Sequence, residues 1–515
     1  MLQNVRAKGP LQFKSSKVTS ILLVASACIF ATTTGFDAAL MNGINIMPSY
    51  TQTLKLTTTT KSLNTAAGFI GSGFVSLWIG PVVNHIGRKR GIMLSIIFKL
   101  MGVVFMSAAQ NVGMFVLGRV LLGMGTGTSG VAASTRRGIG LSAVYTVWYR
   151  ESGALISAGV TYRTANIEGE WSWRLPCLLQ GLFSFACAAV LAFVPESPRW
   201  LAYQGRFNDA LEVVASMQSD GDTTEPLTQA QYREMIDTIE WERAEGKQLN
   251  YKEMLASRGS RKRVMLAVSV AVIAMMSGNN IVSYYLGDML TAAGITSTQT
   301  KLEINVILNA WCFVCALTGT LLMDRIGRKT MCLLSCMAMA TTLFIVGALT
   351  KVYGHGHDTS GTYGTIASIF LFQGSYGIGI TPLTVLYPPE VLNYSIRSNG
   401  MAAWTMAVNI SGVIVTFIFP FGLAAISWKL YMINAAWDVL QFVFVLVFWI
   451  ETKGFTLEEI DRLIDGTKHS NVPDIVDLQN GTAVLEGKGV DSTGAEVDNV
   501  QATKEVKTVV TPTVN

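Results

Sequence analysis

The sequence predicts an all-α membrane protein of about twelve spanning helices in two six-helix halves, and three observations support this. Half of the 515 residues are hydrophobic and only 14% are charged. About twelve apolar stretches have the length, roughly 20 residues, that a helix needs to cross a bilayer. One phrase also occurs twice, as N-H-I-G-R-K-R at 84–90 and as D-R-I-G-R-K at 324–329. Because each copy separates two apolar stretches, we infer a duplicated chain.

The expected spans follow one another with short connections, and a polar linker at 195–263 divides them into two sets of six. In the first half, 19–194, they lie at 19–42, 63–83, 91–109, 113–134, 140–161 and 175–194. In the second half, 264–450, they lie at 264–287, 303–323, 331–350, 364–387, 399–422 and 428–450.

The polar segments predict the orientation in the membrane. Lys and Arg beside membrane helices favour the cytoplasm, and the N-terminal segment 1–18 holds four of them without an acid. Both repeated hairpins are cationic as well. We therefore expect the termini, the linker and the hairpins in the cytoplasm, with the chain in the plasma membrane. The tail 451–515 has too little apolar surface beyond Asp461 to offset the entropy of ordering it, which predicts a disordered C-terminal tail.

Several function classes are disfavoured by the sequence. It has no phosphate-binding G-x-x-x-x-G-K-[ST] loop for ATP, and its G-x-G-x-x-G string lies inside an apolar stretch. The glycines there, Gly118, Gly123, Gly127 and Gly130, fit a face for close helix packing better.

All seven cysteines fall in expected spans, as packing residues. No His or Cys has a plausible base or metal partner, so we expect no enzyme activity, no cofactor and no metal. The net charge of +5 is a topology signal, so no nucleic-acid partner is expected, and no obligate protein partner is inferred beyond the lipid bilayer.

Short strings along nearly the whole chain resemble those of the major facilitator superfamily and, within it, the sugar porter family. The forms M-N-G-I at 41–44 and S-G-N-N-I-V-S-Y-Y at 277–285 are most similar to fungal lactose and oligosaccharide permeases of the hexose type. The resemblance implies a sugar transporter that works by alternating access. The other matching strings are G-F-D at 35–37, G-R at 118–119, W-R at 173–174, P-E-S-P-R-W-L at 195–201, Y-P-P-E at 387–390 with Arg397, and E-T-K-G at 451–454.

Polar side chains in the spans predict the sugar site. Sugar hydroxyls donate and accept hydrogen bonds and ring C–H faces stack on aromatics, so amides with Tyr or Trp suit them. The seventh span offers such residues where Gly278 interrupts it, and interrupted helices near the midplane form such sites. The resemblance assigns Asn280 to the sugar and Tyr284 and Tyr285 to an external gate. The complete set is Asn279, Asn280, Tyr284, Tyr285, Gln180, Asn305, Asn309, Trp404 and Asn409.

For the last five of these, ordinary packing between helices is an equal alternative. The family also has glutamines where this chain has Ala274 and Met275. The sequence therefore leaves open whether the sugar is lactose, cellobiose, a hexose or a pentose.

Asp37 is the lone acid near the middle of the first half, and burial of a lone carboxyl favours its protonated form. The resemblance pairs it with Arg119 on the fourth span, which makes Asp37 the expected proton carrier and Arg119 the residue that tunes it. Lys99 receives no role. The alternatives are a static ion pair in a facilitative uniporter, and a non-transporting sugar sensor.

For the charged residues at the cytoplasmic ends, the resemblance implies a gate whose salt bridges latch the two halves. We expect Glu390 and Arg397 to face each other, and the alternative is that these charges only set the topology. The residues of the expected gate are Arg88, Lys89, Glu196, Arg199, Arg328, Lys329, Glu390, Arg397 and Glu451.

The chain departs from the family pattern at two further places, and its fifth expected span carries two charges. Asn84 stands where the second hairpin has an acid. The first half lacks the Glu of a Glu-to-Arg motif, because Ser134–Gly138 runs straight on. Arg150 and Glu151 fall inside the fifth span, where each charge costs on the order of 3 kcal/mol to insert. A shortened gene model or a damaged copy is therefore an alternative.

Overall fold

Long α-helices, two of them interrupted by breaks, make up the chain, as the apolar stretches predict. The computed structural model describes residues 15–133, 139–225, 228–229, 232–233, 235–237, 239–240, 257–353, 359–392, 396–454, 460 and 464. Within these residues there are helices, turns and bends but no strands. The tail beyond Asp461, apart from residue 464, and the segment Ser134–Gly138 lie outside the described residues, so the expectations about them stay untested.

The helices of the first half and of the linker follow the expected spans closely. The first half consists of α1 (Ser16–Ile46), α2 (Pro48–Thr53), α3 (Thr58–Ser76), α4 (Ile79–Ile86), α5 (Arg88–Ser107), α6 (Val112–Ala133), α7 (Ile139–Thr164) and α8 (Trp171–Phe193). The linker begins with α9 (Pro198–Tyr203) and α10 (Phe207–Gln218).

The second half repeats the pattern of long helices. Its members are α13 (Arg258–Met276), α14 (Asn279–Ala292), α15 (Thr298–Ile326), α16 (Arg328–Tyr353), α17 (Thr359–Val391), α18 (Arg397–Ile426) and α19 (Lys429–Phe448).

Length and hydropathy make the bundle a multi-pass membrane protein. Among the described residues, ten segments can cross a membrane, α13 and α14 counting together as one, and the pair α3–α4, bent by 60°, raises this to eleven. The helix α7 takes the place of the fifth expected span and is 26 residues long. It carries Arg150 and Glu151 and is not among those segments.

The two repeated phrases form the same turn. Gly87 and Gly327 end α4 and α15 with φ angles of 97° and 109°, a region that glycine enters without strain. A Cβ atom at Gly87 would stand 2.7 Å from Oε2 of Glu196, and one at Gly327 would stand 2.6 Å from Oε2 of Glu451. Each half therefore packs its hairpin glycine against a glutamate that follows its last helix, as a duplication predicts.

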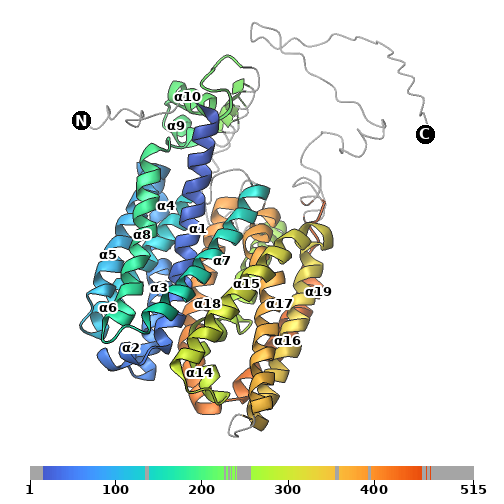
Figure 1. Ribbon diagram of the computed structural model, residues 1–515. Helices are drawn as coiled ribbons and strands as arrows, with labels where there is room; N and C mark the ends of the chain where they lie inside the picture. Colours follow the sequence, from blue (N-terminus) through green and yellow to red (C-terminus); the bar gives the residue numbers. More distant parts are fainter. Residues whose placement is uncertain are drawn as a thin grey trace, which may run out of the picture. The chain divides into compact units, whose positions relative to one another are not determined.

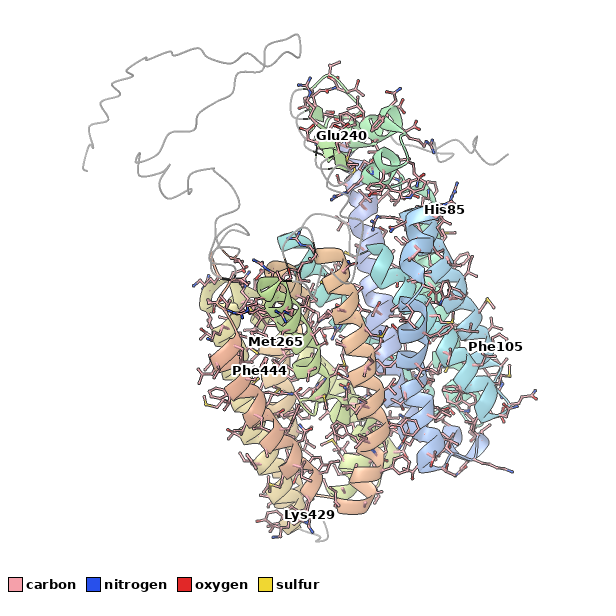
Figure 2. The ribbon with its side chains drawn as sticks, turned by 180° about the vertical axis from the view of Figure 1, so that it is seen from behind. His85, Phe105, Glu240, Met265, Lys429 and Phe444 are labelled. Carbon is pink, nitrogen blue, oxygen red and sulfur yellow. The ribbon has the colours of Figure 1, made fainter. Side chains whose placement is uncertain are left out.

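The two ends of the bundle are distinct. Figure 1 shows α9 and α10 at the end where α1 begins, and α2 and α14 toward the other end. We call these the hairpin end and the distal end. In Figure 2, His85, which precedes the first hairpin, lies near the former, and Lys429, which begins α19, lies at the latter. The backbone N–H of Ser16 donates to Oδ1 of Asp220 in the linker at 2.6 Å, and this bond holds the pKa of Asp220 below its ordinary value.

Glycine contacts let the helices of the first half approach closely. A Cβ atom at Gly123 would collide with the carbonyl of Gly68 on α3, and one at Gly118 would stand 2.8 Å from the carbonyl oxygen of Gly102 on α5. Gly127 packs in the same way against Ser72. The predicted packing face is thus confirmed for these three glycines, and it is wrong for Gly130, which has nothing within 4 Å of a Cβ position.

Candidate functional site

The seventh span is broken at Gly278, as the sequence predicts. Gly278 has φ of 86° in the left-handed region, between the end of α13 at Met276 and the start of α14 at Asn279. Nδ2 of Asn280 donates to the carbonyl oxygen of Met275 at 2.8 Å. Asn280 is 4% exposed, so in this state its amide satisfies a carbonyl that the break leaves free.

Asn279 meets a second amide from α17. Nε2 of Gln373 donates to Oδ1 of Asn279 at 2.8 Å, and Oγ of Ser283 donates to the same oxygen at 3.3 Å. Oε1 of Gln373 and Nε1 of Trp404 have no hydrogen-bond partner within the described part of the chain. Oε1 of Gln373 is therefore an acceptor left for a ligand hydroxyl beside the break. Gln373 was not predicted from the sequence, where it is a lone amide in an apolar stretch.

The tyrosine pair lies where the two halves meet. The ring of Tyr284 stands edge-on to Phe69 of α3, with centroids 6.2 Å apart, and the Tyr284 carbonyl accepts from Nδ2 of Asn45 at 3.1 Å. The hydroxyl of Tyr285 donates to the carbonyl of Thr416 at 2.8 Å. The pair thus contacts α1 and α3 of the other half, which is the place that a gate needs.

A second set of amides joins α1 to α15. Nδ2 of Asn42 donates to Oδ1 of Asn305 at 3.0 Å, and Nδ2 of Asn309 donates to the Asn305 carbonyl at 2.7 Å. Nδ2 of Asn305 is buried without a partner in the described residues. Asn409 instead donates to the carbonyl of Thr405 in its own helix at 2.9 Å. Asn305 and Asn309 thus fit a polar path, while Asn409 is used locally.

Asp37 has a different partner from the one expected. Asp37 is 5% exposed, and Nζ of Lys99 lies 3.2 Å from its Oδ2. Nε2 of Gln180 donates a short hydrogen bond to Oδ1. The expected pairing of Asp37 with Arg119 is wrong, since Nε of Arg119 donates to the carbonyl of Asn64 at 3.4 Å. Gln180, expected at the sugar, is engaged with the carboxylate.

Packing explains this exchange of partners. Arg119 faces α3, where its Nη2 lies 3.3 Å from the position of a Cβ at Gly68. On α6, the helix that carries Arg119, a Cβ atom at Gly125 would stand 2.6 Å from Cγ of Lys99. Glycine at this position therefore leaves room for the lysine side chain to reach Asp37 on α1. The position of Arg119 along the sequence did not reveal which neighbouring helix it faces.

The expected gate residues are used mainly within each half. Oε1 of Glu196 accepts from the backbone N–H groups of Arg88 at 3.0 Å and Lys89 at 2.9 Å. Glu451 accepts in the same way from Arg328 at 2.7 Å and Lys329 at 3.1 Å. A carboxylate at a helix N-terminus satisfies free N–H groups and favours the helix dipole. The two glutamates therefore cap α5 and α16.

Glu390 also pairs inside its own half. Nη2 of Arg328 lies 3.0 Å from Oε1 of Glu390, and Thr452 donates to Oε2 at 2.7 Å. The guanidinium of Arg397 donates to the carbonyl of Leu392 at 3.3 Å, and its expected pairing with Glu390 stays a prediction. In the first hairpin, the carbonyl of Asn84 accepts a hydrogen bond from Nε1 of Trp200 at 2.7 Å. Arg199 lies on α9 of the linker.

Several contacts between the halves lie toward the distal end. Nζ of Lys61 on α3 lies 2.7 Å from Oδ2 of Asp288 on α14. The hydroxyl of Tyr162 donates to Oε1 of Glu303 at 3.3 Å. Together with the bonds from Asn42 and Asn45, these contacts hold the halves together at that end.

Arg150 and Glu151 neutralise each other partly. Nε of Arg150 lies 3.5 Å from Oε1 of Glu151. The glutamate side chain is 14% exposed and the arginine side chain 41% exposed. Pairing lowers the cost of placing both charges in α7, so a membrane helix can carry them.

Two similar halves of apolar helices, with a broken helix and buried polar groups between them, define a membrane transport protein. The chain belongs to the sugar (and other) transporter family, whose model matches residues 23–464. It is 27% identical to a glucose transporter of Aspergillus flavus, covering 84% of this chain and 87% of that protein. It is 26% identical to a high-affinity glucose transporter of Kluyveromyces lactis, covering 90% and 88%, and 25% identical to a galactose-proton symporter of Escherichia coli, covering 89% and 97%.

Solved structures agree on the fold. The proton:xylose symporter XylE bound to 6-bromo-6-deoxy-D-glucose matches with a TM-score of 0.71 at 19% identity, over 87% of this chain and all of that one. The inward-open xylose transporter XylE from E. coli matches with a TM-score of 0.67 at 20% identity, over 86% and 99%. At these identities the likeness shows the fold, which confirms the expected major facilitator architecture.

Proposed function

We propose that this sugar transporter carries a mono- or disaccharide together with a proton, by alternating access. The observation that carries the sugar site is the break at Gly278, where Asn279 and Gln373 meet and Oε1 of Gln373 is left without a partner among the described residues. The names of the relatives, which include glucose and galactose carriers, support a hexose as the first substrate to test.

The proposed orientation puts the hairpin end in the cytoplasm and the distal end outside the plasma membrane. The cationic hairpins and the basic N-terminal segment support it. In this orientation the contacts of Lys61, Asn42 and Asn45 close the outside. Entry of sugar from outside then requires these bonds between the halves to break while contacts at the hairpin end form.

The proposed proton site is Asp37 with Lys99 and Gln180. When Asp37 takes up a proton, it loses its attraction for Lys99 and leaves a buried cation without its partner, which is costly. That cost couples protonation to a movement of α5 against α1.

A facilitative uniporter is the second candidate, and Lys99 is the observation that favours it. With Nζ of Lys99 3.2 Å from Oδ2 of Asp37, the two side chains can act as a static structural ion pair.

Uptake into yeast that lacks its own sugar carriers separates these candidates. Radiolabelled glucose, xylose, lactose and cellobiose are supplied while the external pH is recorded. Symport predicts uptake with a rise in external pH, and Asp37→Asn abolishes the rise. Uptake that survives both a protonophore and Asp37→Asn would establish uniport. Protein that reaches the plasma membrane but carries none of these sugars contradicts the proposal as a whole.

A further inference from the structure

A stripe of three polar residues runs along α19, inside the second half. Asn434, Asp438 and Gln441 are spaced by four and three residues and therefore share one helix face. Asp438 is fully buried, at 0% exposed, and the other two are 5% exposed. The helix packs against α16 and also contacts α13 and α18. Nothing in the proposed transport cycle uses these residues.

The polar atoms of this stripe lack partners in the described part of the chain. Both carboxyl oxygens of Asp438, both amide atoms of Gln441 and Nδ2 of Asn434 make no hydrogen bond there. A buried carboxyl without a donor is rare in proteins, because its desolvation is not compensated. Asp438 therefore needs a small ligand that this half can accommodate.

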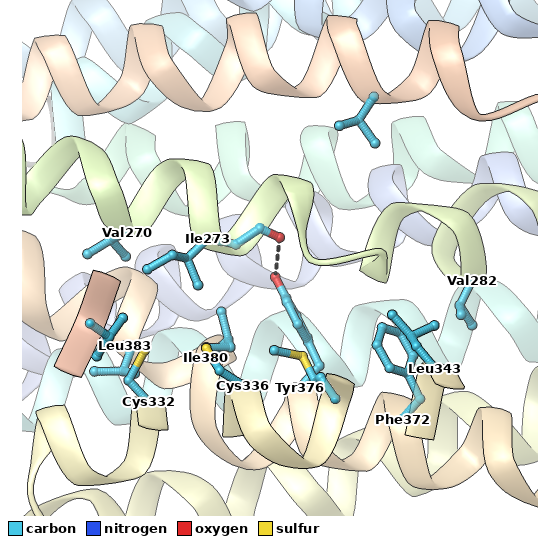
Figure 3. Close-up of a cluster of buried hydrophobic side chains, with 14 of the residues drawn as sticks. Val270, Ile273, Val282, Cys332, Cys336, Leu343, Phe372, Tyr376, Ile380 and Leu383 are labelled. Atoms are coloured by element: carbon cyan, nitrogen blue, oxygen red, sulfur yellow. Dashed lines mark hydrogen bonds between the residues drawn. The ribbon is translucent and has the colours of Figure 1, made fainter. Parts of the chain in front are cut away.

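The surroundings of Asp438 are apolar. The thiol of Cys336 on α16 is near enough to act electrostatically on the carboxyl. Figure 3 shows Cys336 among Cys332, Ile380 and Tyr376, in the core of the second half. The Tyr376 hydroxyl is engaged with the carbonyl of Ala274 at 3.2 Å, so it is not directed at Asp438.

Among the described residues, no Lys or Arg side chain is hydrogen-bonded to Asp438. Asp438 is the only acid in the sequences of α13, α16, α18 and α19, whose charged residues otherwise lie near the helix ends. On α13 they fall within Arg258–Arg263, and on α18 there is Arg397 alone. The remaining ones are Arg328, Lys329 and Lys351 on α16 and Lys429 on α19, and the neighbouring neutral titratable groups are Cys332, Cys336 and Tyr431.

We propose that Asp438 is a proton-binding site of the second half. The carboxylate takes one proton from solution and becomes a neutral acid, whose O–H can donate to Oε1 of Gln441 on the same face. A metal ion suits the place poorly, since hard cations take six or more oxygen ligands and the stripe offers only those of Asn434, Asp438 and Gln441. No group of three or more His, Cys, Asp or Glu side chains stands together in the described residues.

This site contacts the break in the seventh span. A Cβ atom at Gly278 would stand 2.8 Å from Nδ2 of Asn434, so the stripe begins where α13 and α14 meet. A charged Asp438 attracts the amide donors of Asn434 and Gln441, whereas a neutral Asp438 leaves Asn434 against Gly278. Protonation of Asp438 thus acts on the proposed sugar site from the half opposite Asp37. Only this last step rests on the proposed function.

The first test needs no sugar. Thermal unfolding of the purified full chain in detergent is recorded from mildly acidic to mildly alkaline buffer. Charging a buried carboxyl penalises the folded state, so the melting temperature of the unmodified chain falls as the pH rises. Asp438→Asn lacks this pH-dependent loss. The difference in melting temperature between the variant and the unmodified chain therefore grows by several degrees toward alkaline pH. Glu168→Gln, at an exposed acid, is the matched control and shows no such growth.

Two results overturn the proton site. If the difference in melting temperature between Asp438→Asn and the unmodified chain is the same at every pH, Asp438 does not change charge in this range. An Asp438→Asn protein that is less stable toward alkaline pH would show a carboxylate that is stabilised in its charged form. If Asp438→Asn does not fold, Asp438→Leu replaces it, and the infrared band of protonated carboxyl groups in the unmodified chain at neutral pH gives an independent reading. Absence of that band also overturns the proposal.

The link to sugar is tested separately. In the Asp37→Asn background, the apparent sugar affinity still changes several-fold with pH, and adding Asp438→Asn removes that change. If the sugar affinity of the double variant still changes with pH, Asp438 is not linked to the sugar site. The proton site itself is then judged by the unfolding data alone.

Discussion

The ion pair between Asp37 and Lys99 is the residue contact with the largest expected effect on stability. Both side chains are almost fully buried, at 6% and 3% exposed. Removing one partner of such a pair strands the other charge. Lys99→Met is therefore expected to lower the free energy of unfolding by about 3–5 kcal/mol, measured by unfolding of the purified protein.

A double variant shows whether this loss comes from the stranded charge. Asp37→Asn combined with Lys99→Met leaves no charge behind, so it is expected to recover most of the loss. Equal losses in the single and the double variant would mean that the lysine contributes packing alone.

Gly278 allows a second prediction at this scale. Its φ of 86° is costly for an L-residue, and an added Cβ would also meet Nδ2 of Asn434 at 2.8 Å. Gly278→Ala is expected to destabilise the protein by about 1–2 kcal/mol from the backbone alone, and further through Asn434. Gly454→Ala is the matched control, since Gly454 has φ of 78° but nothing within 4 Å of a Cβ. The two variants should differ in melting temperature, and equal losses would contradict a contact with Asn434.

Residue partners were the least predictable feature. The sequence identified Asp37 as a buried acid but assigned it the wrong cation, because helix spacing does not say which neighbour Arg119 faces. Gln373, Asn42 and Asp438 were missed, since a single polar residue in an apolar stretch carries no periodic signal. Their importance appears only when the helices are packed together.

At the scale of elements, the sequence predicts much more. Long apolar stretches and the repeated hairpins predicted both halves, and the structure confirms them. The break at Gly278 was also predictable, because a glycine followed by two asparagines interrupts an otherwise apolar stretch. The caps of α5 and α16 were not, since Glu196 and Glu451 lie far along the chain from the N–H groups they accept from.

These caps lead to a prediction about the two elements. Glu196→Gln and Glu451→Gln each weaken charge-assisted bonds at a helix N-terminus, so each is expected to cost about 1 kcal/mol of stability. Similar losses in the melting temperature of the two variants would reflect the duplicated geometry. Glu168→Gln again serves as the exposed control, and a loss at only one of the two glutamates would contradict an equivalent role.

At the scale of the whole molecule, the ion pair of Lys61 and Asp288 is one of the distal contacts between the halves. The side chains are 16% and 43% exposed, so the pair is weak enough to break during a transport cycle. Lys61→Glu places two negative charges together and is expected to favour separation of the distal ends. The exchange variant, Lys61→Glu with Asp288→Lys, restores the attraction and should restore the closed state.

Cysteine labelling measures that opening directly. Asn45 belongs to the same set of contacts between the halves, since its amide donates to the Tyr284 carbonyl, and only 8% of the residue is exposed. In Asn45→Cys, a membrane-impermeant maleimide added from outside should react slowly, then several-fold faster when Lys61→Glu is added, and slowly again in the exchange variant. The chain without the reporter gives the background from its own cysteines. Labelling that is equally fast in all three would mean that the distal ends separate independently of this pair, and fast labelling only from the cytoplasmic side would reverse the proposed orientation.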